Sequence, residues 1–203
     1  MVKGLDGGQK AALLISEMQN GIANSAYVSS PLSGQVAARA LPEKLNALAS
    51  RFRAGGLPVI HCTIAARPAF QAWPVNCVLA AQIYKRGELV SGSRYAAIHD
   101  SIEVALSDIV SERHHGMAAF TGTDLAATLR ALRVDTVVYS GVSTNVALMG
   151  GSIEAVGLGF TSVIAEDCAA GGTAESHQFQ ITMHLPLVAT VSSADAVCAA
   201  LGV

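Results

Sequence analysis

The fold is decided by residues 136–148, which read TVVYSGVSTNVAL. The first residues of this stretch are those of a buried strand, Gly141 breaks the run, and helical spacing follows. We expect Ser143 or Thr144 to cap the helix by accepting a hydrogen bond from a free backbone N–H. A strand–turn–helix junction directs unpaired N–H groups and the positive end of a helix dipole at one place. We therefore expect a site here for an anion, a polarised carbonyl oxygen or a reactive side chain.

Apolar strands and helical patterns alternate along the rest of the chain. Strands are predicted at residues 10–16, 57–64, 108–111, 136–140, 160–164 and 187–191. Helices are predicted at 34–54, near 75–83, at 125–132, 145–156 and 174–183, and from a cap at Ser193 to Leu201, with one helical turn at 102–105. This alternation predicts one α/β domain over residues 1–203, built on a parallel sheet with right-handed crossovers. The long excursion at 65–99 is expected to form a lid or a subunit contact.

Composition narrows the class of protein. Hydrophobic residues make up 51% of the 203 residues and charged residues only 14%, so part of the apolar surface is expected to be buried in a homo-oligomer, a dimer or a tetramer. The net charge of −2 and the lack of a basic stripe argue against a nucleic-acid partner. No apolar run is long enough for a membrane span, and the N-terminus lacks the pattern of a signal peptide, so a cytoplasmic location is expected. The four cysteines form no CxxC pair and are expected to be reduced or buried thiols.

The first candidate for chemistry is Glu17, which follows the buried strand 10–16. Open α/β sheets bind ligands at the carboxyl ends of their strands. A carboxylate that is partly desolvated there is suited to general acid or base catalysis. The alternative is a structural carboxylate bonded to a neighbouring helix N-terminus.

A second group of candidates comes from the histidines. His114 and the adjacent His115 point in different directions, so at most one is expected to face the pocket of Glu17. A neutral imidazole relays a proton, and Arg113 can hold an anion. His61 competes with both, because its strand also ends at the ligand edge. A metal site built from Glu17 and a histidine would have too few ligands, so no metal and no cofactor are expected.

Further residues are candidates for binding a small-molecule substrate. Asn145 and the hydroxyls beside it either bind substrate or cap the helix. Trp73, in the excursion, is expected to shape a pocket for a ring or a carboxylate. The sequence contains no P-loop, GxGxxG, HExxH or GxSxG motif, which removes the usual nucleotide-binding, zincin and serine-hydrolase interpretations.

Three stretches resemble the isochorismatase-like hydrolase family, also called cysteine hydrolases. Residues 15–20 (ISEMQN) resemble the Asp-Met-Gln-Asn that ends the opening strand of the family. Residues 118–125 (AAFTGTDL) resemble its Ser-Ala-Phe-x-Gly-Thr-x-Leu, and 141–147 (GVSTNVA) resemble its Gly-Val-x-Thr-Asp/Asn-x-Cys. The resemblance covers residues 11–196. It implies a three-layer α/β/α, Rossmann-like fold with a six-stranded parallel sheet of order 3-2-1-4-5-6, and a cis peptide at Val142–Ser143.

The usual triad of the family is Asp, Lys and Cys, and the resemblance places other residues at all three positions. Glu17 stands at the Asp position. The Lys position, four residues before the Ser-Ala-Phe match, falls on His114. Ala147 stands at the Cys position and cannot form an acyl-enzyme, which closes the covalent amidase route there.

The resulting hypothesis is a cofactor-independent hydrolase of a small organic molecule. Glu17 would act as acid or base with His114 as its partner, in enol-ether-type or other hydrolysis. The N–H groups near Val146 and Ala147 would bind an anionic or carbonyl oxygen. The alternative is a retired hydrolase that binds a small ligand or builds an oligomer without turnover.

Overall fold

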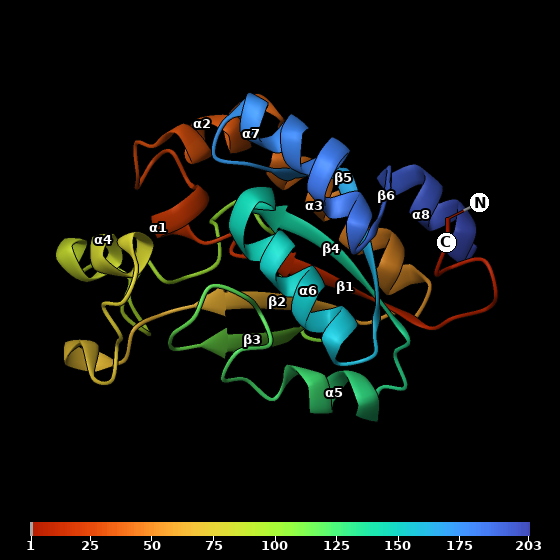
Figure 1. Ribbon diagram of the computed structural model, residues 1–203, viewed down its shortest axis with the longest axis horizontal. Helices are drawn as coiled ribbons and strands as arrows, with labels where there is room; N and C mark the ends of the chain where they lie inside the picture. The colour runs from red at the N-terminus through yellow and green to blue at the C-terminus, as the bar shows by residue number, and fades with distance from the viewer. Residues whose placement is uncertain (1) are drawn as a thin grey trace.

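Six strands form one parallel sheet in the computed structural model, which describes residues 2–203 (Figure 1). The strands are β1 (Ala11–Ser16), β2 (Val59–Ile64), β3 (Ile109–Arg113), β4 (Thr136–Val142), β5 (Thr161–Ala170) and β6 (Thr190–Ser192). Their order in the sheet is β3-β2-β1-β4-β5-β6. The predicted fold class and strand order are therefore confirmed.

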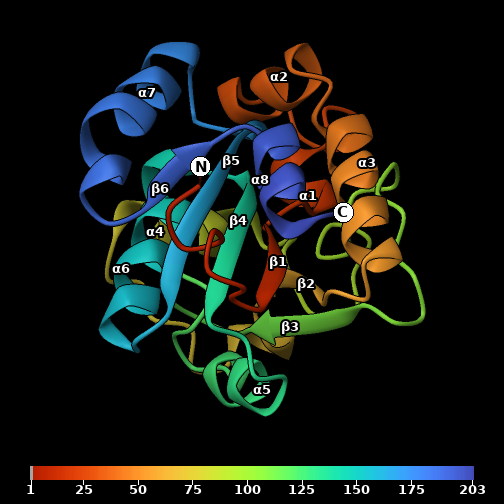
Figure 2. The same ribbon diagram turned by 90° about the vertical axis from the view of Figure 1, so that its right-hand side faces the viewer.

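Side chains of the central strand β1 alternate between the two faces of the sheet, and each face is covered by helices. Leu13 and Ile15 belong to the core under α2 (Pro31–Ala38), α3 (Leu41–Ala54) and α8 (Ala194–Leu201), whereas Ala12 and Leu14 belong to the core under α5 (Leu125–Ala131) and α6 (Met149–Gly157) (Figure 2). All six residues of β1 are buried, because a central parallel strand is covered on both faces. The other α-helices are α1 (Asn20–Ala23), α4 (Val78–Arg86) and α7 (Ala174–Phe179).

Short helical segments complete the chain at the ends of these elements. They are the 3₁₀ turns η1 (Pro68–Phe70) and η4 (Leu185–Leu187) and the π-helical turns η2 (Thr144–Leu148) and η3 (Gln180–His184). Ser193 caps α8 as predicted, by accepting a hydrogen bond of 3.2 Å from the amide of Ala196. No helix within residues 2–203 has the length and apolarity that crossing a bilayer requires.

Several predicted boundaries are wrong. The single helix predicted at 34–54 is two helices, broken where Ala40 takes the left-handed conformation (φ 48°). Pro42 explains the break, because its ring would clash with a helical carbonyl four residues earlier and it has no N–H to donate. The helical turn predicted at 102–105 is absent from the described chain. The strand predicted at 108–111 is shifted and extends to Arg113, which matters for the site.

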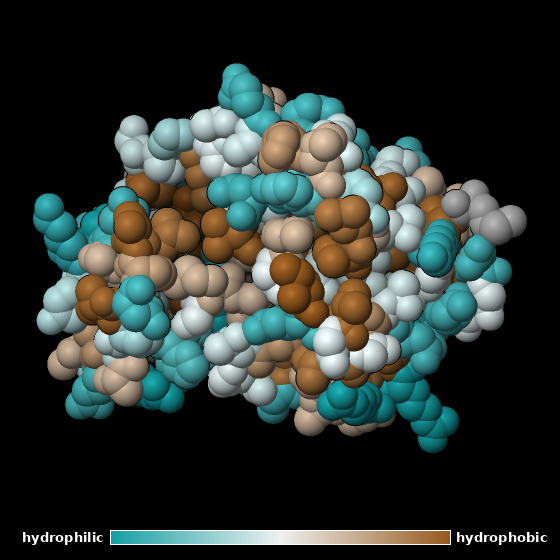
Figure 3. All heavy atoms as spheres, in the orientation of Figure 1, coloured by the Kyte–Doolittle hydropathy of each residue, from teal (hydrophilic) through white to brown (hydrophobic). Residues whose placement is uncertain are grey.

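Exposed apolar side chains gather on α6 and on the helical segment that follows β5. Ile153 and Val156 of α6 and Phe179 and Met183 of α7 and η3 are each about half exposed, and brown side chains are prominent over these elements in Figure 3. They are compatible with the homo-oligomer expected from the low content of charged residues, which stays a prediction.

Candidate active site

The carboxyl ends of β1 and β3 bring an acid and a cation together. Glu17 is the first residue after β1, and its amide donates to the carbonyl of Cys62 at the end of β2 (2.8 Å). Arg113 is the last residue of β3 and pairs in register with Ile64 of β2. The Nη2 of Arg113 donates a hydrogen bond to Oε1 of Glu17, and the two side chains form an ion pair.

This ion pair is buried at one end and accessible at the other. The side chain of Arg113 is 2% exposed, whereas that of Glu17 is 15% exposed. The backbone of Glu17 is left-handed (φ 50°), a conformation that costs free energy in a non-glycine residue. The strand therefore ends in a turn that leaves the carboxylate accessible beside a fixed guanidinium.

Gln19 fixes this turn to the rest of the sheet. Its side chain is fully buried, donates to the carbonyls of Ile64 (2.9 Å) and Ala96 (2.6 Å), and accepts from the amide of Ile64 (2.8 Å). Because both ends of the amide group are engaged, the segment that carries Glu17 is held at the end of β2.

The junction after β4 reaches the same place. Gly141 has φ 86°, and a Cβ there would lie 2.4 Å from the carbonyl oxygen of Ser16, so only glycine allows β4 to approach the end of β1 this closely. The peptide bond between Val142 and Ser143 is cis, as the resemblance implied. The helix then begins as the π-helical turn η2, and Ser143 and Val146 line the cavity next to Glu17.

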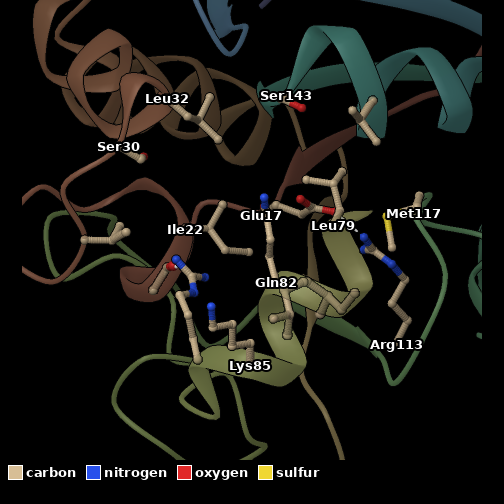
Figure 4. Close-up of a pocket in the computed structure, with 16 residues that line it drawn as sticks. Glu17, Ile22, Ser30, Leu32, Leu79, Gln82, Lys85, Arg113, Met117 and Ser143 are labelled. Carbon is tan, nitrogen blue, oxygen red and sulfur yellow. Dashed lines mark hydrogen bonds and ion pairs between the residues drawn. The ribbon is translucent and has the colours of Figure 1, made fainter. Parts of the chain in front are cut away.

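A cavity of about 610 Å³ opens above these residues. Apolar side chains surround it where α1, α2, α4 and the start of η2 meet, and Figure 3 shows the corresponding brown hollow. Figure 4 shows Glu17 and Arg113 on one side of this space, Leu32 and Ser143 above it, and Gln82 and Lys85 of α4 below it. The cavity volume is that of a site for a small organic molecule.

The predicted partner of Glu17 was His114, and the structure places Arg113 there instead. The side chains of β3 alternate, so Arg113 and Ser111 are buried, while Glu112 and His114 are each about 30% exposed. Nδ1 of His114 lies 2.9 Å from the carbonyl oxygen of Ala65 and 3.9 Å from Oε1 of Glu112. The spacing of four residues before the Ser-Ala-Phe match is thus wrong for this chain, in which the basic residue beside the acid stands five residues before Ala118.

Two other predicted residues lie outside this cavity. His61 is buried, and its Nε2 lies 3.0 Å from Oδ2 of Asp108, which also binds Arg53 of α3. His61 therefore belongs to an ion-pair cluster at the opposite end of β3. Trp73 is 7% exposed, donates to the carbonyl of Ala80 (3.1 Å), and lines a separate cavity of about 410 Å³.

The predicted cradle of backbone N–H groups is not formed at Val146. The amide of Val146 is not free, because it donates to the carbonyl of Ser143 (3.2 Å). Ala147 is 2% exposed and belongs to the core cluster that includes Cys62 and Phe120. Asn145 is exposed and accepts a hydrogen bond from the amide of Gly172 (3.0 Å), so it fixes a neighbouring loop. Ser143 is the N-cap residue by position, but its side chain makes no capping hydrogen bond, and Oγ1 of Thr144 contacts His177, so the cap predicted at Ser143 or Thr144 is not formed.

No thiol is available beside Glu17 for nucleophilic chemistry. Cys62, at the end of β2, is 1% exposed, and burial raises the pKa of its thiol to about 12. A thiol with so high a pKa carries almost no thiolate at neutral pH. Nothing within residues 2–203 groups three or more His, Cys, Asp or Glu side chains in a way that could hold a metal ion.

A buried network that the sequence did not predict lies next to η2. His177 of α7 is 3% exposed, and its Nδ1 lies 3.4 Å from Oγ1 of Thr144. Its Nε2 lies 3.7 Å from Oε2 of Glu166, whose backbone carbonyl accepts a hydrogen bond of 2.9 Å from Arg39. Burial lowers the pKa of His177. A single His after a glycine-rich turn gave no signal in the sequence, because its partners come from three distant segments.

Comparisons with known proteins agree with this architecture. The Isochorismatase domain family matches residues 11–196. The chain belongs to the isochorismatase family. A curated relative, the uncharacterised isochorismatase family protein YecD of Escherichia coli O157:H7, is 30% identical over 193 residues, which is 94% of this chain and 95% of that protein.

Two further proteins illustrate the range of this family. The maleamate amidohydrolase of Pseudomonas putida is 30% identical over 172 residues, covering 84% of this chain and 77% of that protein. The crystal structure of an isochorismatase family protein from Desulfovibrio vulgaris superimposes with a TM-score of 0.83 at 22% identity, covering 97% of this chain and all of that one. The latter likeness concerns the fold alone. The family is one of hydrolases, some of which are amidohydrolases.

Proposed function

We propose that this chain hydrolyses a small organic molecule by non-covalent acid/base chemistry, with Glu17 as the proton carrier and Arg113 as its charge partner. The observation that carries the proposal is the ion pair between these residues, which both line a cavity of about 610 Å³. Ala147 offers no nucleophilic atom, and the buried thiol of Cys62 is not activated. Water is therefore the nucleophile of this proposal.

The ion pair favours a reaction in which Glu17 first acts as a base. A carboxylate that binds a guanidinium carries negative charge, and arginine does not give up its proton in proteins. This arrangement supports activation of water at a carbonyl carbon, in amide or ester hydrolysis, over initial protonation of an enol ether.

The bond changes of this step balance with Glu17 alone. Its carboxylate takes one proton from water while the water oxygen adds to the carbonyl carbon. The carbonyl oxygen gains negative charge, which the guanidinium of Arg113 stabilises. When the carbon–nitrogen or carbon–oxygen bond breaks, Glu17 returns the proton to the leaving nitrogen or oxygen.

The alternative is a binding protein that arose from a hydrolase. Replacement of the usual acid, base and nucleophile positions supports it, as does the amide of Val146, which is engaged by Ser143 and so not free for an oxyanion. In that case the cavity would hold a ligand without turnover.

Glu17→Gln tests the proposal, because the amide keeps the size of the side chain and removes its basicity. We expect the wild type to hydrolyse members of a panel of amides, esters and enol ethers, with amides and esters preferred. The variant should lose about 10²- to 10⁴-fold in kcat. The matched control is Glu88→Gln, because Glu88 is an exposed acid whose replacement should leave turnover unchanged. Turnover unaffected in Glu17→Gln would refute the role of this residue, and ligand binding without turnover in the wild type would support the alternative.

A further inference from the structure

Helix α4 presents one continuous face to the cavity. Leu79, Gln82, Ile83 and Arg86 all line it, and they follow the i, i+3, i+4, i+7 spacing of a single helix face. This face is apolar near the start of the helix and cationic near its end, where Lys85 also lines the cavity. Tyr84 points elsewhere, with its ring 5.2 Å from that of Phe70.

The two cations of α4 are not neutralised within the protein. Among residues 2–203, Lys85 and Arg86 have no carboxylate partner within ion-pair distance. Arg86 is held by a hydrogen bond of 3.3 Å from its Nη2 to the carbonyl oxygen of Gly21, in the short helix on the other side of the cavity. Its guanidinium keeps further N–H donors for a ligand.

The charged groups of the cavity thus lie at two separate places, Glu17 with Arg113 and Lys85 with Arg86. Figure 4 shows Lys85 on one side, with Ile22 above it, and Arg113 with Met117 on the other, while Leu79 and Gln82 lie between the two sides. A molecule that spans the cavity would place one end at Glu17 and Arg113, an apolar middle against these aliphatic side chains, and its other end at the cations of α4.

We propose that Lys85 and Arg86 form an anion-recognition subsite, so that the substrates are small monoanions with a carboxylate at one end and a hydrolysable amide or ester at the other. An apolar spacer joins the two groups. The placement of the amide or ester rests on the proposed function, whereas the binding of the carboxylate does not. The cations of α4 then determine specificity and take no part in bond breaking.

Calorimetric titration with a matched pair of probes tests this subsite. Adipamate has a carboxylate at one end and a primary amide at the other, and adipamide differs from it only by a second neutral amide in place of the carboxylate. We expect the wild type to bind adipamate about tenfold more tightly than adipamide, a preference that two exposed charge contacts can supply together. The preference should decrease as the salt concentration rises.

The double variant Lys85→Gln/Arg86→Gln should bind the two probes equally. The control is Lys44→Gln/Arg67→Gln, which removes the same charge at exposed positions outside the cavity lining and should keep the preference. Equal binding of the two probes by the wild type, binding of neither, or a preference that survives in Lys85→Gln/Arg86→Gln would overturn the subsite. The preference should also persist in Glu17→Gln. Absence of hydrolysis with the preference intact would count against the proposed function alone.

Discussion

Two ion-pair clusters stand at the two ends of β3, and each pairs a carboxylate with an arginine. At the amino end, Asp108 accepts hydrogen bonds from Arg53 (2.6 and 2.9 Å) and from the amide of Ala105 (3.0 Å), and lies 3.0 Å from His61. At the carboxyl end, Arg113 donates to Glu17.

The clusters differ in how completely the acid is satisfied. The side chain of Asp108 is 1% exposed and both of its oxygens are engaged. Glu17 is 15% exposed and, among the described residues, its side chain has Arg113 as its hydrogen-bond partner through one oxygen. A closed set of bonds stabilises the fold, whereas an acid with a free oxygen beside a cavity can act on a ligand. Burial and charge alone do not distinguish the two cases.

The largest difference in stability between the two clusters is expected when the acid of each, Asp108 or Glu17, is replaced by its amide. Asp108→Asn leaves Arg53 and His61 without their anion, and breaking a buried pair in this way costs about 3–5 kcal/mol in the free energy of unfolding. Glu17→Gln should cost less, about 1–2 kcal/mol, because the amide oxygen of glutamine can still accept a hydrogen bond from the buried guanidinium of Arg113. Urea unfolding of both variants measures the difference. Equal losses of stability would show that Glu17 is as structural as Asp108.

The arginines of the two clusters provide the reciprocal comparison. Arg113→Met removes the charge beside Glu17 and should lower kcat by about 100-fold, the effect of losing one donor to a developing oxyanion. Arg53→Met should leave kcat within about twofold at a temperature where the variant is folded, because Arg53 contacts Asp108 outside the cavity. Steady-state kinetics with the best substrate of the panel provides the measurement. A larger loss of kcat in Arg53→Met than in Arg113→Met would reverse the assignment of the two clusters.

How well each part of the site is predicted from sequence depends on whether its contacts are local or join distant segments of the chain. The run AALLIS in residues 11–16 is continuous and apolar, so it identified a central strand and placed Glu17 at its carboxyl end. The strand order came from the resemblance of three ordered motifs, and no local pattern would have supplied it.

Whether His114 or Arg113 faces Glu17 depends on where strand β3 ends. With β3 ending at Ser111, residues 112–115 would lie in a loop, and either His114 or Arg113 would be free to turn inward. The observed strand continues to Arg113, and alternation then directs that side chain inward and His114 away. Two residues of strand length therefore decided between an imidazole and a guanidinium.

The cationic end of α4 was missed for a similar reason. The helix was predicted near 75–83 and is observed at Val78–Arg86, so Arg86 fell outside the expected helix face. His61 was assigned to the ligand edge because its strand ends there, but its partners Arg53 and Asp108 come from a helix and a loop that the sequence did not bring together.

The smallest expected effect is a dependence of the free energy of unfolding on pH, to which the Asp108 cluster contributes through His61. Burial lowers the pKa of His61, even though Asp108 acts in the opposite direction, and burial likewise lowers the pKa of His177. A histidine in the unfolded chain has a pKa of about 6.5. As the pH falls below about 6.5, the unfolded chain therefore takes up protons that the folded chain does not, and the free energy of unfolding decreases.

The Asp108 cluster also predicts a second loss of stability at lower pH. Burial by itself would raise the pKa of Asp108, but the hydrogen bonds that this carboxylate accepts lower it to about 2. Its contribution to stability is therefore present above the unfolded pKa of about 4 and is lost as the pH falls toward 2. Urea unfolding at a series of pH values should show a decrease from pH 7 to 5 and a further one below pH 4. In His61→Asn the first decrease should become smaller, whereas in Glu17→Gln it should match the wild type. A stability that stays constant from pH 7 to 5 would mean that His61 and His177 take up protons as readily in the folded chain as in the unfolded chain.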